Sequence, residues 1–430
     1  MKKPVFALID CNNFFVSCER VFRPDLADQP VAVLSNNDGC IVARSNEVKT
    51  LGVPMGAPEF KWRNVLQNNR VKLFSANFAL YGDFSRRVVE ILGGFTPNME
   101  VYSVDESFLE VSSLLIDDHS KWAGELRASV LKQTGIPVSV GVAPSKTLAK
   151  AAVTFAKQHP ETGGALNLLG LNQTKRQDVL DQLPIGEVWG VGRRLAPKLQ
   201  GFGLRTAGDL ARVSPNWARQ HLTIRGERTV RELKGESCFP LVLDGVDHEQ
   251  KSLAVTRSFG HNLRAVHELE RALSTFAARA AARLRRKHQI AGGLVAFIST
   301  GAGAAKPFRP STLVRLPYPS NDTSRLVTAA LDGLSVLYDP NYAYRKAGVI
   351  LVNLLPETAQ QTTFEQTGRL EQLQRRDELM TAIDQLNRKY GTDTVKTAAQ
   401  GAQERERWAS QRQRVSPAYT TRWAEIPVLP

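Results

Sequence analysis

The 430-residue sequence predicts an α+β protein with about three or four domains. Strand-like and helix-like segments alternate through residue 160, which predicts a mixed sheet with helices packed on it. From Ser252 onward the order of elements becomes β-α-β-β-α-β, a ferredoxin-like split arrangement. Length and the change of pattern together indicate at least two separate cores.

The first strand is an unbroken apolar run, Val5 to Ile9, that ends in the carboxylate Asp10. Asp105 and Glu106 lie between two further strand-like runs. Burying carboxylates beside one another is unfavourable unless a cation neutralises them, and oxygen ligands favour a hard ion such as Mg²⁺. The three carboxylates therefore predict a site for two divalent ions, as used in phosphoryl transfer. An exposed acidic turn is the alternative interpretation of Asp105 and Glu106.

The elements between these carboxylates and residue 160 follow from local signals. The Asp-Gly pair within Ser35 to Gly39 predicts a hairpin, although a plain surface turn is the alternative. Gly52 closes a short helix. The expected helices cover residues 12–20, 45–51, 84–92 and 122–134, and the expected strands cover residues 31–34, 40–43 and 138–142.

Residues 183 to 213 predict a helix-hairpin-helix. Gly190 and Gly192 form a Gly-x-Gly turn that lets backbone N–H groups approach a phosphate. Arg193, Arg194 and Lys198 add positive charge beside it. A turn in an ordinary helical linker is the alternative.

The positive charge is concentrated in the middle of the chain. The net charge is +14, and residues 176 to 360 carry 26 basic against 16 acidic side chains. A basic helix covers residues 266–288 and carries Arg279, Arg283, Arg285, Arg286 and Lys287, with Arg257, Arg309 and Arg315 on or beside strands. A solvated helix face is the usual meaning of such a run, but its place in the most basic segment favours contact with a nucleic-acid backbone.

The remaining features exclude several classes of protein. Cys11, Cys18, Cys40 and Cys238 form no CxxC pair and show no zinc-ligand spacing, which favours a reduced cytoplasmic protein. No apolar stretch is long enough to span a bilayer, so we expect no contact with a membrane. Residues 357–368 are expected to be a linker and residues 369–390 an amphipathic helix, while residues 408–430 show aromatic side chains without recognisable chemistry.

Several segments resemble the motifs of Y-family translesion DNA polymerases, and two resemble the UmuC branch in particular, the catalytic subunit of bacterial polymerase V. The matching segments are Asp10 to Glu19, Val33 to Cys40, Tyr102 to Phe108, Gly141 to Lys150 and Ser416 to Trp423. The resemblance covers nearly the whole chain. It implies a right-hand polymerase with a ferredoxin-like palm (1–22 and 78–175), small fingers (23–77), a helix-hairpin-helix thumb (176–243), a β-α-β-β-α-β little finger (250–356) and a tail (357–430).

The resemblance also assigns the catalytic centre. Asp10, Asp105 and Glu106 match the ligands of two Mg²⁺ ions, with the main-chain carbonyl of Cys11 as a further ligand. Phe15 matches the steric gate, the ring that excludes a ribose 2′-hydroxyl, although ordinary helix packing is the alternative for one of Phe14 and Phe15. Adjacent strand residues point to opposite faces, so Asp105 and Glu106 can converge only at a hairpin bend.

Further residues match the nucleotide and DNA contacts of the family. The expected nucleotide-binding residues are Phe14, Phe15, Lys49 and Lys157. The two lysines match the triphosphate cations, with lysine at position 49 where many members carry arginine; solvent exposure is the alternative for both. Val33, Cys40 and Val42 match the cover of the nascent base pair. The expected DNA contacts are Gly190, Gly192, Arg193, Arg194, Lys198, Arg257, Arg283 and Arg286.

The implied partners are primer-template DNA, a deoxynucleoside triphosphate (dNTP), a processed UmuD-like dimer and a RecA-type recombinase filament. A sliding clamp is implied less well, because the segment Gln360 to Phe364 lacks both leucines of the expected peptide. The gate is phenylalanine, where tyrosine is expected in this branch. Two other functions remain open on the residues alone, a non-catalytic DNA-binding subunit of a repair complex and a nucleotidyl cyclase.

Overall fold

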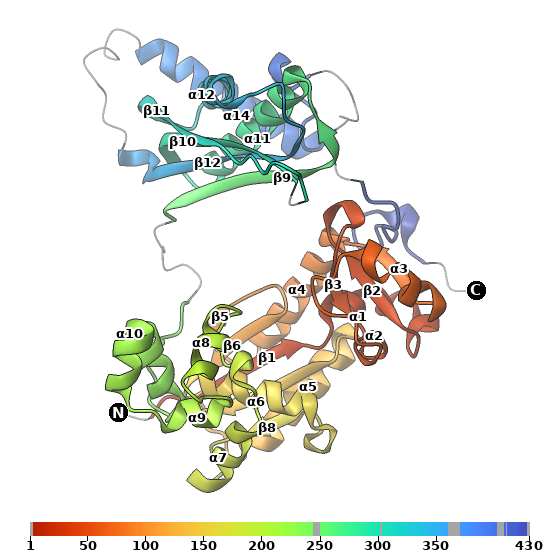
Figure 1. Cartoon of the computed structure of the whole chain (residues 1–430), viewed down its shortest axis with the longest axis vertical. Helices are drawn as coiled ribbons and strands as arrows, with labels where there is room; N and C mark the ends of the chain where they lie inside the picture. Colours follow the sequence, from red (N-terminus) through yellow and green to blue (C-terminus); the bar gives the residue numbers. More distant parts are fainter. Residues whose placement is uncertain are drawn as a thin grey trace. The chain divides into compact units, whose positions relative to one another are not determined.

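The computed structural model describes residues 3–243, 250–301, 303–359, 370–401, 408–409 and 411–427. The chain forms two compact units. Unit 1 comprises residues 1–35, 39–246 and 414–430, and unit 2 comprises residues 36–38 and 247–413. Each unit has its own sheets and core (Figure 1).

The central sheet of unit 1 has the strand order β5-β6-β1-β7-β8. Strand β1 (Phe6–Cys11) is antiparallel to both β6 (Glu106–Glu110) and β7 (Val138–Ala143). The outer strands are β5 (Met99–Val101) and β8 (Ala165–Asn167). All six residues of β1 are buried, as expected of a strand covered on both faces.

Helices cover the two faces of this sheet and separate its side chains into two cores. Ala7 and Ile9 of β1 belong to one core, whereas Phe6 and Leu8 belong to the other. The period-2 alternation of a strand places Asp10 on the same face as Leu8. The covering helices are α1 (Phe14–Val21), α4 (Phe78–Gly93), α5 (His119–Thr134) and α6 (Lys146–Gln158).

A second, smaller sheet in unit 1 has the order β3-β2-β4. The predicted hairpin is confirmed, because β2 (Val31–Leu34) and β3 (Ile41–Arg44) are antiparallel. Strand β4 (Lys72–Ser75) is parallel to β2 and was not expected from the sequence. The helices beside this sheet are α2 (Asn46–Thr50) and α3 (Glu59–Asn68).

The helical part of unit 1 contains the predicted Gly-x-Gly turn. Gly190 has φ 90°, a left-handed conformation that favours glycine. The helices are α7 (Gln173–Asp181), α8 (Leu195–Gly201), α9 (Ala207–Arg212) and α10 (Pro215–Leu233). The glycine turn precedes α8, and a single 3₁₀ turn (Ile185–Glu187) lies between α7 and the glycines, where the first helix of the hairpin is predicted.

Unit 2 has the predicted β-α-β-β-α-β order. Its sheet has the order β11-β10-β12-β9 with α11 and α12 packed on it (Figure 1). The elements are β9 (Ser252–Leu263), α11 (Val266–Arg286), β10 (Gln289–Thr300), β11 (Ser311–Ser320), α12 (Thr323–Leu337), β12 (Tyr344–Pro356) and α14 (Leu370–Tyr390). The order of elements predicted from residue 252 is therefore confirmed, but β9 is an edge strand, whereas the first strand of a ferredoxin-like sheet is central.

Candidate active site

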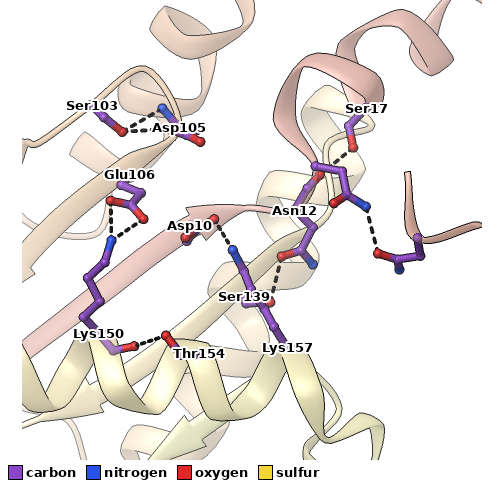
Figure 2. A network of polar contacts seen from close by, with 12 residues as sticks. Asp10, Asn12, Ser17, Ser103, Asp105, Glu106, Ser139, Lys150, Thr154 and Lys157 are labelled. Carbon is purple, nitrogen blue, oxygen red and sulfur yellow. Dashed lines mark hydrogen bonds and ion pairs between the residues drawn. The ribbon is translucent and has the colours of Figure 1, made fainter. Parts of the chain in front are cut away.

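Asp10 and Glu106 lie directly opposite each other across strands β1 and β6. Opposed residues of an antiparallel pair project from the same face, so both carboxylates face helix α6. Asp10 is 8 % exposed. The sequence prediction that two strands bring carboxylates together is confirmed for this pair (Figure 2).

Two lysines of α6 neutralise the pair. Lys150 Nζ donates to both carboxylate oxygens of Glu106, at 2.5 and 2.7 Å. Lys157 Nζ donates to Asp10 Oδ1 (Figure 2). The two lysines are seven residues apart, which places them on one side of the helix. Lys150 was not predicted as a site residue. Its spacing of seven residues from Lys157 could have indicated that both lysines face the same site.

The electrostatics of the two carboxylates differ. Burial, together with the neighbouring Glu106, raises the pKa of Asp10 to about 7 against the attraction of Lys157. Burial also acts to raise the pKa of Glu106, but its hydrogen bond with Asp10 and its ion pair with Lys150 outweigh burial and hold that pKa below its ordinary value. The pair therefore favours one shared proton or an added cation.

Asp105 lies in the bend that precedes β6. Its Oδ1 accepts a hydrogen bond from Ser103 Oγ at 2.5 Å, and its carbonyl accepts from Cys11 N–H at 2.8 Å. Figure 2 shows its carboxylate directed at Ser103 rather than at the Asp10–Glu106 pair. In the part of the chain that the structure describes, no three His, Cys, Asp or Glu side chains form a metal-binding group.

Asp10 and Glu106 nevertheless fit a divalent cation. The donor set is carboxylate oxygen, and each carboxylate already binds a positively charged nitrogen. Asp105 is adjacent to Glu106 at a bend, so a change of its side-chain rotamer is the smallest movement that could bring in a third carboxylate.

The Cys11 thiol is buried, and burial raises its pKa well above the ordinary value. A thiolate nucleophile is therefore disfavoured at this position. Asn12 extends the polar network behind the site, since its Oδ1 accepts from Ser139 Oγ at 2.9 Å (Figure 2).

Phe15 and Phe14 occupy different environments at the start of α1. Phe14 is 3 % exposed and belongs to the core, whereas Phe15 is half-buried. Phe15 stacks on Tyr81 of α4, with ring centroids 4.4 Å apart. The geometry favours Phe15 over Phe14 as the ring that faces a ligand, and it leaves Phe14 only its backbone for such a contact.

Lys49 lies within electrostatic range of Lys157. Desolvation lowers the pKa of Lys49, and the charges of Lys157 and then Arg44 lower it further. Three cations that repel one another in this way form a favourable place for a polyanion. Arg44 was missed in the sequence, where it reads as an ordinary strand residue.

The predicted cover of the base pair needs one correction. Val33 is fully buried among core residues of unit 1, so its side chain packs the small sheet and cannot cover a base pair. Cys40 and Val42 are each half-buried. A register irregularity between Val33 and Leu34 accompanies the short hairpin, and such irregularities were not readable from the strand pattern.

The predicted DNA contacts of unit 1 lie beside the Gly-x-Gly turn. Arg193 and Arg194 are exposed, and Gly192 is exposed between them and Val191. Lys198 is also exposed, but its Nζ donates to the carbonyl of His221 at 2.7 Å. The two arginines are thus the more available cations.

The predicted basic helix of unit 2 is divided between two roles. Arg257, Arg283 and Arg286 are exposed. Arg285 instead forms a bidentate ion pair with Asp384 of α14, at 2.7 and 2.8 Å. Arg279 pairs with Asp393, with its Nε and Nη2 both donating to Oδ2, so neither Arg279 nor Arg285 supplies free charge to a nucleic acid.

Two further expectations concern the rest of the chain. The degenerate clamp segment Gln360 to Phe364 lies outside the described residues. Among the described residues, no helix combines the length and apolar character that crossing a membrane requires.

Comparison with known proteins gives the family. The model of the impB/mucB/samB family matches residues 9–154, and the model of that family's C-terminal domain matches residues 250–364. A third model, of the IMS family HHH motif, matches residues 174–204. Protein ImpB of Salmonella typhimurium is 37 % identical over 430 residues, covering 99 % of each chain. Protein UmuC of Salmonella typhimurium strain LT2 is 38 % identical over 427 residues, covering 98 % of this chain and 99 % of the relative. The chain belongs to the impB/mucB/samB family.

More distant relatives and solved structures agree with this assignment. DNA polymerase IV 1 of Bacillus subtilis is 27 % identical over 407 residues, covering 93 % of each chain. A Y-family DNA polymerase chimera of Dbh and Dpo4 matches with a TM-score of 0.65 at 22 % identity, covering 82 % of this chain and 99 % of the chimera. The family member described here is thus a UmuC-like Y-family DNA polymerase with the α+β fold of that class. A model described as a domain of unknown function matches residues 377–429.

Proposed function

We propose that this Y-family polymerase adds dNTPs opposite damaged template bases in the SOS response, by a two-metal mechanism centred on Asp10, Asp105 and Glu106. The observation that carries the proposal is the opposed pair of carboxylates, buried Asp10 and half-buried Glu106, faced by cations from α6. Two Mg²⁺ ions, when bound, would stabilise the attacking and leaving oxygens of an in-line displacement. Asp105 and the carbonyl of Cys11 would complete the oxygen ligand set.

The remaining residues bind and orient the nucleotide. The N-terminus of α1, at Phe14 and Phe15, presents backbone N–H groups that have no partner within the helix, and such groups favour a phosphate. Lys49 and Lys157 contribute positive charge to the triphosphate. The primer 3′-oxygen attacks the α-phosphate and pyrophosphate leaves.

Phe15 would select the sugar, and Cys40 with Val42 would determine which template bases fit. The half-buried ring of Phe15 would lie under the incoming sugar and leave no space for a 2′-hydroxyl. Cys40 and Val42 are small, so a cover built from them would leave room for a distorted template base. We propose that this additional space allows a damaged template base to be accommodated during synthesis.

The proposed domain roles follow the resemblance. Residues 1–22 and 78–175 would be the palm, 23–77 the fingers, 176–243 the thumb, 250–356 the little finger and 357–430 a linker and tail. Arg193, Arg194, Arg257, Arg283 and Arg286 would contact the backbone of primer-template DNA. The proposed partners in the cytoplasm are a UmuD-like processed dimer, a RecA-type filament and a sliding clamp, although residues 360–364 lack both leucines of the expected clamp peptide.

A non-catalytic DNA-binding subunit is the competing function. It would retain the arginine surfaces but would not need Asp10 and Glu106 opposed on one face of the sheet with Lys150 and Lys157 beside them, an arrangement that suits a metal ion together with a phosphate. A nucleotidyl cyclase would use a similar carboxylate pair but would not need exposed arginines beside the Gly-x-Gly turn.

Primer extension separates the three functions. We would compare undamaged and abasic templates with Mg²⁺ and all four dNTPs, with and without a UmuD-like dimer and a recombinase filament. Asp10→Ala and Asp105→Ala should abolish extension, and Asp117→Ala, which removes an exposed carboxylate outside the site, should not. Binding of DNA without extension under every condition would favour the non-catalytic subunit, and cyclisation of a nucleotide without a template would favour the cyclase.

A further inference from the structure

A buried polar cluster joins the end of the chain to helices α1 and α4 within unit 1. We call residues 414–427 the C-terminal strap. Its Ser416 is buried, and its Oγ donates a hydrogen bond to Glu19 Oε1 of α1 at 3.1 Å. Glu19 is fully buried, and the same oxygen accepts from the Tyr81 hydroxyl of α4 at 2.6 Å. Three segments far apart in the sequence therefore meet at one carboxylate oxygen.

The strap is docked by further contacts on both sides of Ser416. The N–H of Ser75 donates to the carbonyl of Arg414 at 2.9 Å, which adds a parallel bridge to strand β4. The ring of Tyr419 is buried and stacks on Phe22 with centroids 4.4 Å apart. These contacts fix the strap independently of the polar cluster.

Asn77 connects the strap to the start of helix α4. Its Nδ2 donates to Ser416 Oγ at 3.0 Å, and its Oδ1 caps the helix by accepting from the N–H of Leu80 at 3.3 Å. The hydrogen bonds thus form one directed chain, in which Asn77 donates to Ser416 and Ser416 donates to Glu19. Tyr81 lies one turn inside the helix that Asn77 caps.

Tyr81 is the surface on which Phe15 rests. The two rings are stacked with an interplanar angle of 14°, and Tyr81 is only 1 % exposed. Phe15 and Glu19 are four residues apart on α1, so they lie on the same face of the helix. Phe15 therefore contacts the ring of Tyr81 while Glu19, one turn later, holds the hydroxyl of that ring.

We propose that Ser416 of the strap and Glu19 are positioning residues for sugar selection, because they hold the Tyr81 ring that supports Phe15. This inference rests on the proposed function, in which Phe15 excludes the 2′-hydroxyl of a ribonucleotide. Ser416 and Glu19 touch neither nucleotide nor metal in this role. They act by fixing how far the Phe15 ring can retreat from the sugar.

The chemistry of Glu19 explains why the strap matters. Burial raises the pKa of Glu19, and the hydrogen bonds from Tyr81 and Ser416 oppose that shift. Among the described residues, Glu19 Oε2 has no hydrogen-bond partner, and the hydrogen bonds from Tyr81 and Ser416 both fall on Oε1. Removing the Ser416 hydroxyl would leave one donor on a buried carboxyl, which favours rearrangement of the group and of the tyrosine bound to it.

Single-nucleotide insertion kinetics test the proposal. For each full-length variant, kcat/KM is measured for a dNTP and for the matching ribonucleotide on an undamaged primer-template. Ser416→Ala and Tyr81→Phe should each reduce the ratio of the two values, by about tenfold if about 1.4 kcal/mol of discrimination is lost. Their double variant should lose little more than one single variant, since both changes act through Glu19 Oε1.

Two matched variants separate positioning from general stability. Glu19→Gln keeps an Oε1 acceptor for both hydroxyls and should retain the wild-type ratio. Thr421→Ala removes an exposed hydroxyl of the same strap and should change neither ratio nor dNTP insertion. If Ser416 and Tyr81 had a structural role alone, their variants would lower kcat/KM for both nucleotides equally. An unchanged ratio of the dNTP value to the ribonucleotide value in Ser416→Ala and Tyr81→Phe would therefore overturn the proposal.

Hydrogen exchange provides a readout that needs no polymerase activity. Ser416→Ala should speed exchange of backbone amides in the first turns of α1 and α4, while Thr421→Ala should not. If the wild-type chain extended no primer, the proposed function would fail, and exchange would still decide whether the strap holds these helices. Unchanged exchange in Ser416→Ala would show that it does not.

Discussion

Gly141 of strand β7 lies directly against helix α6, and Gly141→Ala should damage both stability and activity. A Cβ at this position would lie 2.3 Å from the carbonyl oxygen of Ala149, 2.8 Å from Ala152 Cβ and 2.8 Å from the nitrogen of Val153. Cβ contacts under 3.0 Å are essentially never seen, and two of these atoms belong to the backbone. The helix must therefore move, because no flexible side chain can yield.

The size of the effect follows from that geometry. Overpacking of a core costs about 1–3 kcal/mol, and rigid backbone neighbours place Gly141→Ala near the upper end, at about 3 kcal/mol. The same helix carries Lys150 and Lys157. A shift of about 1 Å at catalytic groups can cost about 100-fold in rate, so primer extension should fall by about that factor.

Urea unfolding and steady-state dNTP insertion measure the two effects. Gly124→Ala is the matched control, since Gly124 is an exposed position of helix α5 with no heavy atom within 4 Å of an added Cβ. It should raise the free energy of unfolding by about 0.5–1 kcal/mol, because alanine favours a helix interior over glycine. A Gly141→Ala protein that matched the wild type in both unfolding midpoint and insertion rate would refute the packing argument.

Three further results are expected. Lys157→Ala should raise KM for a dNTP by about tenfold, as expected for the loss of about 1.4 kcal/mol of charge interaction, with DNA affinity unchanged; equal KM values would remove Lys157 from the triphosphate site. Changing Arg193 and Arg194 together to glutamine should weaken DNA binding and reduce the slope of log Kd against log salt by about 2, one phosphate for each arginine; an unchanged slope would contradict the assigned surface. Because the folded pKa of Glu19 is raised, its contribution to stability is fully present below its ordinary value of 4.5 and is lost as pH rises through the raised value. The free energy of unfolding of the wild type relative to Glu19→Gln should therefore fall as pH rises above about 4.5 in urea titrations, and a constant difference would contradict a raised pKa.

The carboxylate pair could be predicted because its signal is local. An apolar run that ends in Asp10, and a second strand that begins at Glu106, are visible within a few residues. Their meeting across β1 and β6 then needs only antiparallel pairing. Asp105 illustrates the limit, because its bond to Ser103 depends on the conformation of a bend that strand periodicity does not describe.

The basic helix of unit 2 was interpreted less well. Its arginines look alike in sequence, and the basic run as a whole favours a DNA surface, although only Arg283 and Arg286 of this helix are predicted as contacts. Arg279 and Arg285 pair with Asp393 and Asp384, residues 114 and 99 positions away. A count of charges within one helix cannot detect such partners. Asp384 and Asp393 lie much later in the chain, so the count assigns their negative charges to another segment.

The contact between Ser416 and Glu19 spans 397 residues, so no sequence window contains both partners. One half of the signal was nevertheless present in α1. The apolar residues Phe14, Val16 and Cys18 surround Glu19 on a short helix, and all four are buried. A carboxyl at such a position needs hydrogen-bond donors from elsewhere, since burying it alone is costly. The segment 408–430 shows no recognisable chemistry in the sequence, yet its Ser416 supplies one of those donors. The requirement of Glu19 for a donor is the physical reason for the role beside Phe15 that we propose for this segment.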